Sequence, residues 1–144
     1  MTPTQHLVAA CLAMVALTFG VGLRMFRVRV GEMMARRINP QSVALSGQRA
    51  RRLEDSRASD NFNHLFEVPV LFYLLCAVAI GTAYIPAWLP ALAWLFVLTR
   101  IVHSVIQCSY NRVMHRFAVF LASFFLLMAM WAMYGVSFLA LQPG

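Results

Sequence analysis

The chain has 144 residues, of which 61% are hydrophobic and only 12% charged, and its formal net charge is +7 at pH 7. A soluble domain is about 45–50% apolar and about 25% charged, so this composition, with a mean hydropathy of +0.70, excludes an ordinary soluble globule and indicates a membrane protein. The basic residues are all arginine and lie beside or within apolar stretches. Membrane topology therefore explains the positive charge better than nucleic-acid binding does, and we expect no nucleic-acid partner.

Three stretches carry no Asp, Glu, Lys or Arg: residues 1–23, 68–99 and 117–144. A helix needs about 20 residues to cross a hydrocarbon core of about 30 Å. The first and third stretches fit one span each, whereas the second is long enough for two. The first stretch also lacks the basic start of a signal peptide, so it is predicted to be retained as a helix. The sequence thus predicts a single all-α domain over residues 1–144, an integral membrane four-helix bundle.

The expected helices run over about residues 4–34, 61–83, 87–110 and 115–141. The first extends beyond its uncharged stretch because arginine side chains can reach from a helix toward the lipid headgroups. A polar loop over residues 36–60 follows it. Gly81, Pro86 and Pro90 mark the turn between the second and third helices, because Gly and Pro interrupt helices.

The arginines also predict the orientation in the membrane. Nine of them lie in the first connection and its flanks, Arg112 and Arg116 lie at the third connection, and the second connection and both termini have none. The positive-inside rule then places the first and third connections in the cytoplasm and both termini outside. The three cysteines, Cys11, Cys76 and Cys108, are isolated in apolar stretches, so neither a disulfide framework nor a metal site is predicted.

Two charged side chains are predicted to be buried at membrane depth, Glu67 in the second helix and Arg100 in the third, with His103 one turn further along. An unpaired charge at membrane depth costs about 3 kcal/mol or more, so such side chains face the bundle interior or a wet cavity. Counted at about 1.5 Å per residue from the cytoplasmic helix ends, the depths are about 9 Å, 15 Å and 10 Å respectively. We therefore predict an ion pair between Glu67 and Arg100 or His103. The alternative is that these residues only hold two helices together.

Polar side chains recur at helical spacing in three stripes on the second and third helices. The stripes are Arg57, Asn61 and His64; Asn63 and Glu67; and Arg100, His103, Gln107 and Tyr110. With Arg112 and Arg116 at the start of the fourth helix, they are predicted to line a polar pocket that opens to the cytoplasm.

Over roughly residues 50–125 the chain resembles the family of membrane-associated proteins in eicosanoid and glutathione metabolism (MAPEG), which includes the microsomal glutathione transferases. The segments that carry the resemblance are RASDNFNHLFEVPVLFY, from Arg57, and RIVHSVIQCSYN, from Arg100. The first matches the second-helix pattern Arg-Ala-x-x-Asn followed by Glu and Pro. The second matches the third-helix pattern Arg-x-x-His or Tyr, through Arg100 and His103. Arg116 stands where the family's thiolate-stabilising arginine is expected.

The chain departs from the family pattern at two places. The family usually has Glu three residues after the motif Asn, where this chain has His64, and Glu67 comes later. Either Asn63 is the pocket amide or the local alignment shifts, so the choice between Asn61 and Asn63 stays open. A Tyr expected seven residues after the third-helix Arg is Gln107 here, and Tyr110 is the nearest replacement.

The resemblance implies a homotrimer with glutathione, the co-substrate, bound between subunits. It assigns the catalytic role to Arg116, which would favour the thiolate. Arginines would hold the carboxylates of glutathione, with Arg24 or Arg27 as possible additions, and Glu67 would meet its ammonium group. The residues predicted to bind glutathione are Arg57, Asn61, Asn63, Glu67, Arg100, His103, Gln107, Tyr110 and Arg112.

The predicted function is a bacterial-type inner-membrane glutathione (or similar thiol) transferase or peroxidase, acting on lipophilic electrophiles or lipid peroxides that arrive through the bilayer. The alternative is a non-enzymatic lipid-binding or scaffold member, since the family includes a lipoxygenase-activating protein without transferase activity. A small transporter with Glu67 and Arg100 as coupling charges is disfavoured, because no break is predicted within the second and third helices.

Overall fold

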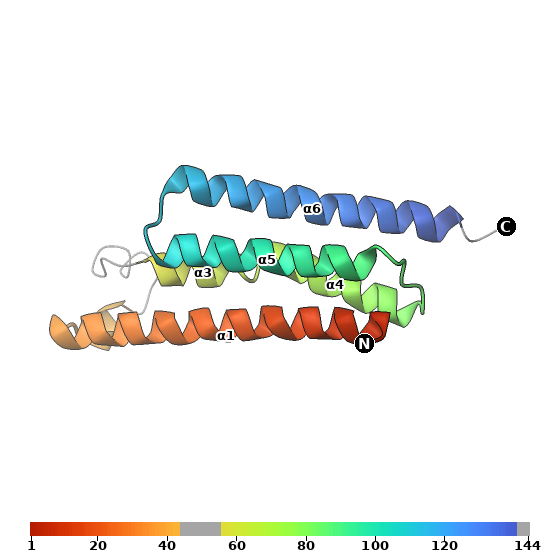
Figure 1. The fold of residues 1–144 in the computed structure, drawn as a ribbon. Coiled ribbons are helices and arrows are strands. Elements are labelled where there is room, and N and C mark those ends of the chain that lie inside the picture. The colour runs from red at the N-terminus through yellow and green to blue at the C-terminus, as the bar shows by residue number, and fades with distance from the viewer. Residues whose placement is uncertain (44–55, 141–144) are drawn as a thin grey trace.

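The computed structural model of the chain describes residues 1–43 and 56–140, and within these ranges it contains helices and no strands. The helices are α1 (Pro3–Ala35), η1 (Pro40–Val43), α3 (Arg57–His64), α4 (Val68–Gly81), α5 (Leu89–Cys108) and α6 (Val113–Ala140). Four segments are long and apolar enough to cross a membrane: α1, α3 with α4, α5, and α6. They run up and down, so the two termini lie at one end of the bundle (Figure 1). The predicted all-α membrane four-helix bundle is confirmed.

Helix α1 is longer than a bilayer core requires. Thr2 caps its start, because the Thr2 hydroxyl accepts from the Gln5 N–H while the Gln5 side chain accepts from the Thr2 N–H. The helix has 33 residues, which corresponds to about 50 Å. Arg37 follows its end with a φ of 50°. The predicted 36–60 loop contains η1, the start of α3, and residues 44–55, which lie outside the described part of the chain.

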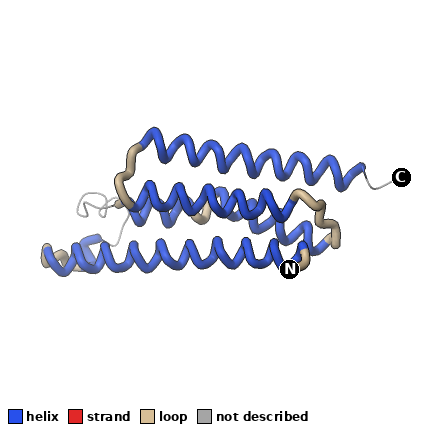
Figure 2. The backbone as a smooth tube through the Cα atoms, viewed as in Figure 1, coloured by secondary structure: helices blue, strands red, loops and turns tan. Residues whose placement is uncertain are grey.

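The second span differs from the single helix predicted over residues 61–83. It begins at Arg57 and is interrupted after His64, and α4 starts at Val68. Figure 2 shows a short loop segment at this break, within the middle layer of the bundle. Pro69 explains it, because proline has no N–H to donate and its ring clashes with the carbonyl four residues earlier. The expectation of an unbroken second helix, on which the argument against a transporter depended, is wrong.

Helix α5 is the central helix of the bundle. It packs against α1, α3 and α6. In its most apolar 18-residue stretch 44% of the residues are buried, compared with 22% in the corresponding stretches of α1 and α6. Phe72 of α4 stacks on Phe96 of α5 with ring centroids 4.7 Å apart. On the other side, Gly22 of α1 faces the ring of Phe62, so closely that a Cβ at this glycine would lie 3.0 Å from Phe62 Cε2. Aromatic side chains thus pack α4 against α5 and α3 against α1.

The end of the bundle that carries the termini is closed by a small polar contact. The hydroxyls of Thr82 and Tyr134 lie 2.8 Å apart and join α6 to the residues that follow α4. Ala83 follows with a φ of 54°, a left-handed conformation that costs an L-residue about 1–2 kcal/mol. All charged side chains of the four spans lie away from this end.

Candidate functional site

The polar side chains of the bundle gather at the end opposite the termini, between α1, α3, α5 and α6. Asn61 of α3 is fully buried there. Its Oδ1 accepts a hydrogen bond from Ser104 Oγ at 3.3 Å, and its Nδ2 donates to Cys108 Sγ at 3.3 Å. Both amide atoms thus bond to α5. Asn61 and not the exposed Asn63 occupies the bundle interior.

Two arginines bind the carbonyl end of α5. Arg24 Nη2 of α1 donates to the Cys108 carbonyl at 2.6 Å, and Arg57 Nη1 of α3 donates to the Ser109 carbonyl at 2.7 Å. The last carbonyls of a helix lack intrahelical partners and carry partial negative charge, so cations are favourable there. The two guanidinium groups therefore connect α1, α3 and α5 at the mouth of the polar region.

Arg100 is the one charged side chain in the described residues that is fully buried. Its Nη1 donates to Ser123 Oγ of α6 at 3.3 Å, and its Nη2 donates to the His64 carbonyl at 3.5 Å. That carbonyl lies at the end of α3, where the interruption of the second span leaves it accessible to a side chain. The Arg100 Nε has no hydrogen-bond partner.

The predicted ion pair between Glu67 and Arg100 or His103 is wrong. The Glu67 carboxylate lies 2.8 Å from His64 Nδ1, and its side chain is 56% exposed. The reason is the break before Pro69, which turns Glu67 to the outer surface instead of continuing the helical stripe inward. The structure thus separates the only acidic residue of the predicted pocket from the buried arginine.

His103 and Gln107 continue the buried row along α5. His103 Nδ1 lies 3.2 Å from the Arg116 carbonyl oxygen. Because a carbonyl oxygen can only accept, Nδ1 carries the proton, and in the neutral ring Nε2 is then an acceptor. This Nε2 and both amide atoms of Gln107 are buried without a hydrogen-bond partner. Each unsatisfied buried polar group costs about 1–3 kcal/mol. Arg100, His103 and Gln107 therefore present donors and acceptors to a common interior region, and we call these three residues the α5 polar row.

An aromatic wall adjoins this row. The rings of His64, His103 and Phe120 lie with their centroids 6.1 to 6.3 Å apart. They come from α3, α5 and α6 respectively, so the wall closes the space between the three helices on one side of Arg100. An apolar group of a ligand could pack there.

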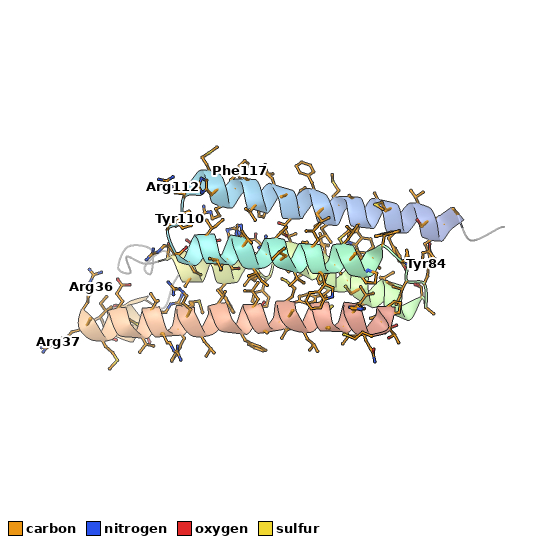
Figure 3. All side chains as sticks on the ribbon, in the orientation of Figure 1. Arg36, Arg37, Tyr84, Tyr110, Arg112 and Phe117 are labelled. Atoms are coloured by element: carbon orange, nitrogen blue, oxygen red, sulfur yellow. The ribbon has the colours of Figure 1, made fainter. Side chains whose placement is uncertain are left out.

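Arg116 lies in the first turn of α6, directly after the connection from α5. Its Nη1 donates to Asn111 Oδ1 at 3.0 Å, and Asn111 makes the turn with a φ of 47°, which asparagine tolerates. Arg116 is half-buried, whereas Tyr110 and Arg112 are exposed. Figure 3 shows Tyr110 and Arg112 at the tip of the bundle. The Tyr110 hydroxyl lies 3.4 Å from His115 Nδ1.

The structure thus brings some predicted site residues together and leaves others outside. Asn61, Arg100, His103 and Gln107 are buried, Arg57 and Arg116 are half-buried, and Asn63, Glu67, Tyr110 and Arg112 are exposed. Sequence reasoning missed Ser104 and Ser123, the hydroxyl partners of Asn61 and Arg100. Ser104 could have been found from its position four residues after Arg100. No group of three or more metal-ligating side chains occurs among the described residues.

The chain was compared with protein-family models, curated proteins and solved structures. The model of the MAPEG family matches residues 7–136, which include all four membrane spans except their outermost residues. Neither the curated proteins nor the solved structures contain a match to the chain.

Proposed function

Because the chain belongs to the MAPEG family, we propose that it is a membrane-bound transferase or peroxidase that uses glutathione or a similar small thiol. Its acceptor would be a lipophilic electrophile or a lipid peroxide. Family membership supports a multi-pass membrane protein of glutathione and eicosanoid metabolism. The reaction and the thiol are our proposal.

The observation that carries this proposal is the α5 polar row. The buried atoms of this row that have no hydrogen-bond partner are the Nε–H donor of Arg100, the Nε2 acceptor of His103, and the donor and acceptor of the Gln107 amide. Glutathione has two carboxylates, which accept hydrogen bonds, and two peptide amides, which both donate and accept. It can therefore pair with the donors and with the acceptors of the α5 polar row. Charge-assisted hydrogen bonds to its carboxylates would be the strongest contacts.

Arg116 is the residue we propose to activate the thiol. It is half-buried at the start of α6 and is held by Asn111, and its backbone carbonyl is tied to His103. A fixed guanidinium favours the thiolate over the thiol. The thiolate sulfur would attack the electrophilic carbon of one substrate class, or the distal oxygen of a peroxide, without a covalent enzyme intermediate.

The exposed acidic residue supports the proposed homotrimer. Glu67 lies on the outer surface of the single chain between two segments of a membrane span, next to the exposed Asn63. A charge exposed to lipid at that position is costly, and a neighbouring subunit would cover it. Glu67 could then meet the ammonium group of glutathione bound between subunits.

We also propose an inner-membrane location with both termini on the periplasmic side. The two termini lie at one end of the bundle and the labelled Arg36, Arg37 and Arg112 lie at the other (Figure 3). The positive-inside rule assigns the arginine-rich end to the cytoplasm.

Thiol-dependent turnover by the Arg116→Ala variant tests the proposal. The protein would be purified in detergent and assayed with glutathione and a panel of lipophilic electrophiles and hydroperoxides. Removal of one charge-stabilising donor typically lowers kcat about 10²- to 10³-fold, and we expect a loss of that order. Arg36→Ala is the matched control, because Arg36 pairs with Glu32 on the exposed end of α1 and should retain activity. Unchanged turnover in Arg116→Ala would refute the catalytic assignment.

A non-enzymatic lipid-binding member of the family is the second candidate. It is favoured by an apolar groove of about 280 Å³ between α1 and α4, lined by residues that include Val8, Leu12, Val15 and Ala77. This candidate predicts that the protein binds a fluorescent fatty acid but shows no thiol chemistry. Turnover of any electrophile would count against it, whereas substrate-driven uptake into vesicles would support a transporter instead.

A further inference from the structure

The outer face of α1 carries exposed apolar side chains that lead to an arginine. Phe19, Leu23 and Arg27 follow one another at steps of four residues, and Phe26 lies beside them, so all four share one side of the helix. The three apolar side chains are 61–69% exposed, and Arg27 is exposed too. We call these four residues the α1 outer row. They face lipid and not the interior of the bundle.

Arg27 lies at the level of the lipid headgroups. Arg24 Nη2 donates to the carbonyl of Cys108, the last residue of α5, so this level marks the end of the apolar span. At about 1.5 Å per residue, Arg27 lies about 4.5 Å beyond Arg24. A headgroup region of about 5–7 Å borders each side of a hydrocarbon core of about 30 Å. The Arg27 guanidinium is therefore at phosphate depth, and Phe19, about 12 Å further in, is within the same leaflet.

The neighbouring arginines bind protein atoms, whereas Arg27 does not. Arg24, Arg29 and Arg57 each donate a hydrogen bond to an oxygen of another helix or of its end. The Arg27 side chain has no hydrogen bond or ion pair within the described part of the chain. The positions three and four residues from it along α1 hold no acidic residue, so no helical ion pair neutralises it. Its charge therefore remains for a partner outside the chain.

We propose that the α1 outer row binds an anionic phospholipid of the adjoining leaflet, with the lipid phosphate at Arg27 and an acyl chain along Leu23 and Phe19. A guanidinium holds a phosphate through two parallel hydrogen bonds. Arg24 lies one turn away and adds positive charge. A headgroup with a net negative charge is therefore favoured over a zwitterionic one, whose ammonium group the two arginines would repel. The exposed apolar side chains next to Arg27 select a lipid over a free phosphate.

The test titrates lipid into the full-length protein in detergent and measures bound lipid by native mass spectrometry. The two probes are phosphatidylglycerol, which is anionic, and phosphatidylcholine, which is zwitterionic, with identical acyl chains. Arg27→Gln should weaken the first phosphatidylglycerol bound by about fivefold, the effect of one arginine near a lipid surface, and should leave phosphatidylcholine binding unchanged. Arg37→Gln is the matched control, because it removes the same charge from a residue beyond the last turn of α1, at the far tip of the helix (Figure 3).

Three results would overturn the proposal. Unchanged phosphatidylglycerol binding in Arg27→Gln, or equal losses in Arg27→Gln and Arg37→Gln, would show that no site exists at Arg27. Displacement of the lipid by an equal concentration of glycerol phosphate would show that the apolar side chains contribute nothing. A changed number of subunits in Arg27→Gln, read from the same mass spectra, would assign this face to a second copy of the chain. None of these measurements involves a thiol, so they are independent of the proposed transferase function.

Discussion

Replacement of Arg100 by methionine separates a binding role of this residue from a structural one. Arg100 is fully buried, and its two hydrogen bonds, at 3.3 and 3.5 Å, go to neutral acceptors at Ser123 and His64. Ser123 Oγ also donates to the Phe120 carbonyl, so it keeps a partner in the variant. No charge is left unpaired when the guanidinium is removed. A buried charge replaced by an apolar side chain of similar volume is often neutral or stabilising.

The expected magnitudes follow from these contacts. A hydrogen bond to a charged group contributes about 1.5–3 kcal/mol, and each 1.4 kcal/mol is about tenfold in affinity. Arg100→Met should therefore weaken glutathione binding by about 10- to 150-fold in calorimetric titration, while the melting temperature stays within a few degrees of that of the wild type. Arg36→Met is the matched surface control. An unchanged Kd in Arg100→Met would refute the binding role, and a collapsed melting temperature would show that Arg100 is structural.

The remaining predictions concern packing and backbone strain, measured as thermal unfolding in detergent. Gly22→Leu should lower the free energy of unfolding by about 1–3 kcal/mol, because a Cβ at this position already meets Phe62 Cε2 at 3.0 Å. Gly20→Leu is the control and should not lower it, since a Cβ at Gly20 meets nothing within 4 Å. Equal losses in the two variants would contradict the close packing of α1 on α3. Ala83→Gly should raise stability by about 1 kcal/mol, because it relieves the positive φ of 54°. Ala87→Gly has no such strain to relieve and should give no gain, so a gain of equal size in both variants would argue against the strained turn.

The break in the second span was within reach of sequence reasoning, although it was not predicted. Pro69 stands in the middle of a 25-residue span, and a proline inside a helix removes a hydrogen bond and clashes with the preceding turn. The apolar run after Glu67 favoured one continuous helix, because hydropathy is a property of side chains. It does not register that Pro69 lacks the backbone N–H that a continuous helix needs. The consequence was the wrong partner for Glu67.

The candidate site was predicted in part. Asn61, Arg100, His103 and Gln107 follow helical spacing on helices that do meet, so periodicity was enough to select them. Ser104, which donates to Asn61, lies four residues after Arg100, so helical spacing along α5 could have added it to the buried face. The contact of Arg100 with Ser123 depends on how α6 is rotated against α5, and no pattern within either helix specifies that rotation.

The sequence by itself determined how many times the chain crosses the membrane and which end of the bundle is cationic. Both are sums of local transfer free energies along the chain, so uncharged stretches and arginine positions suffice to predict them. Only the tertiary structure decided which polar atoms meet. The interruption before Pro69 turned Glu67 outward and left the His64 carbonyl to Arg100. The packing of α1 on α4 placed Cys11 and Cys76 along the same groove. Such contacts depend on the rotation and register of whole helices, which are set by packing between segments far apart in the chain.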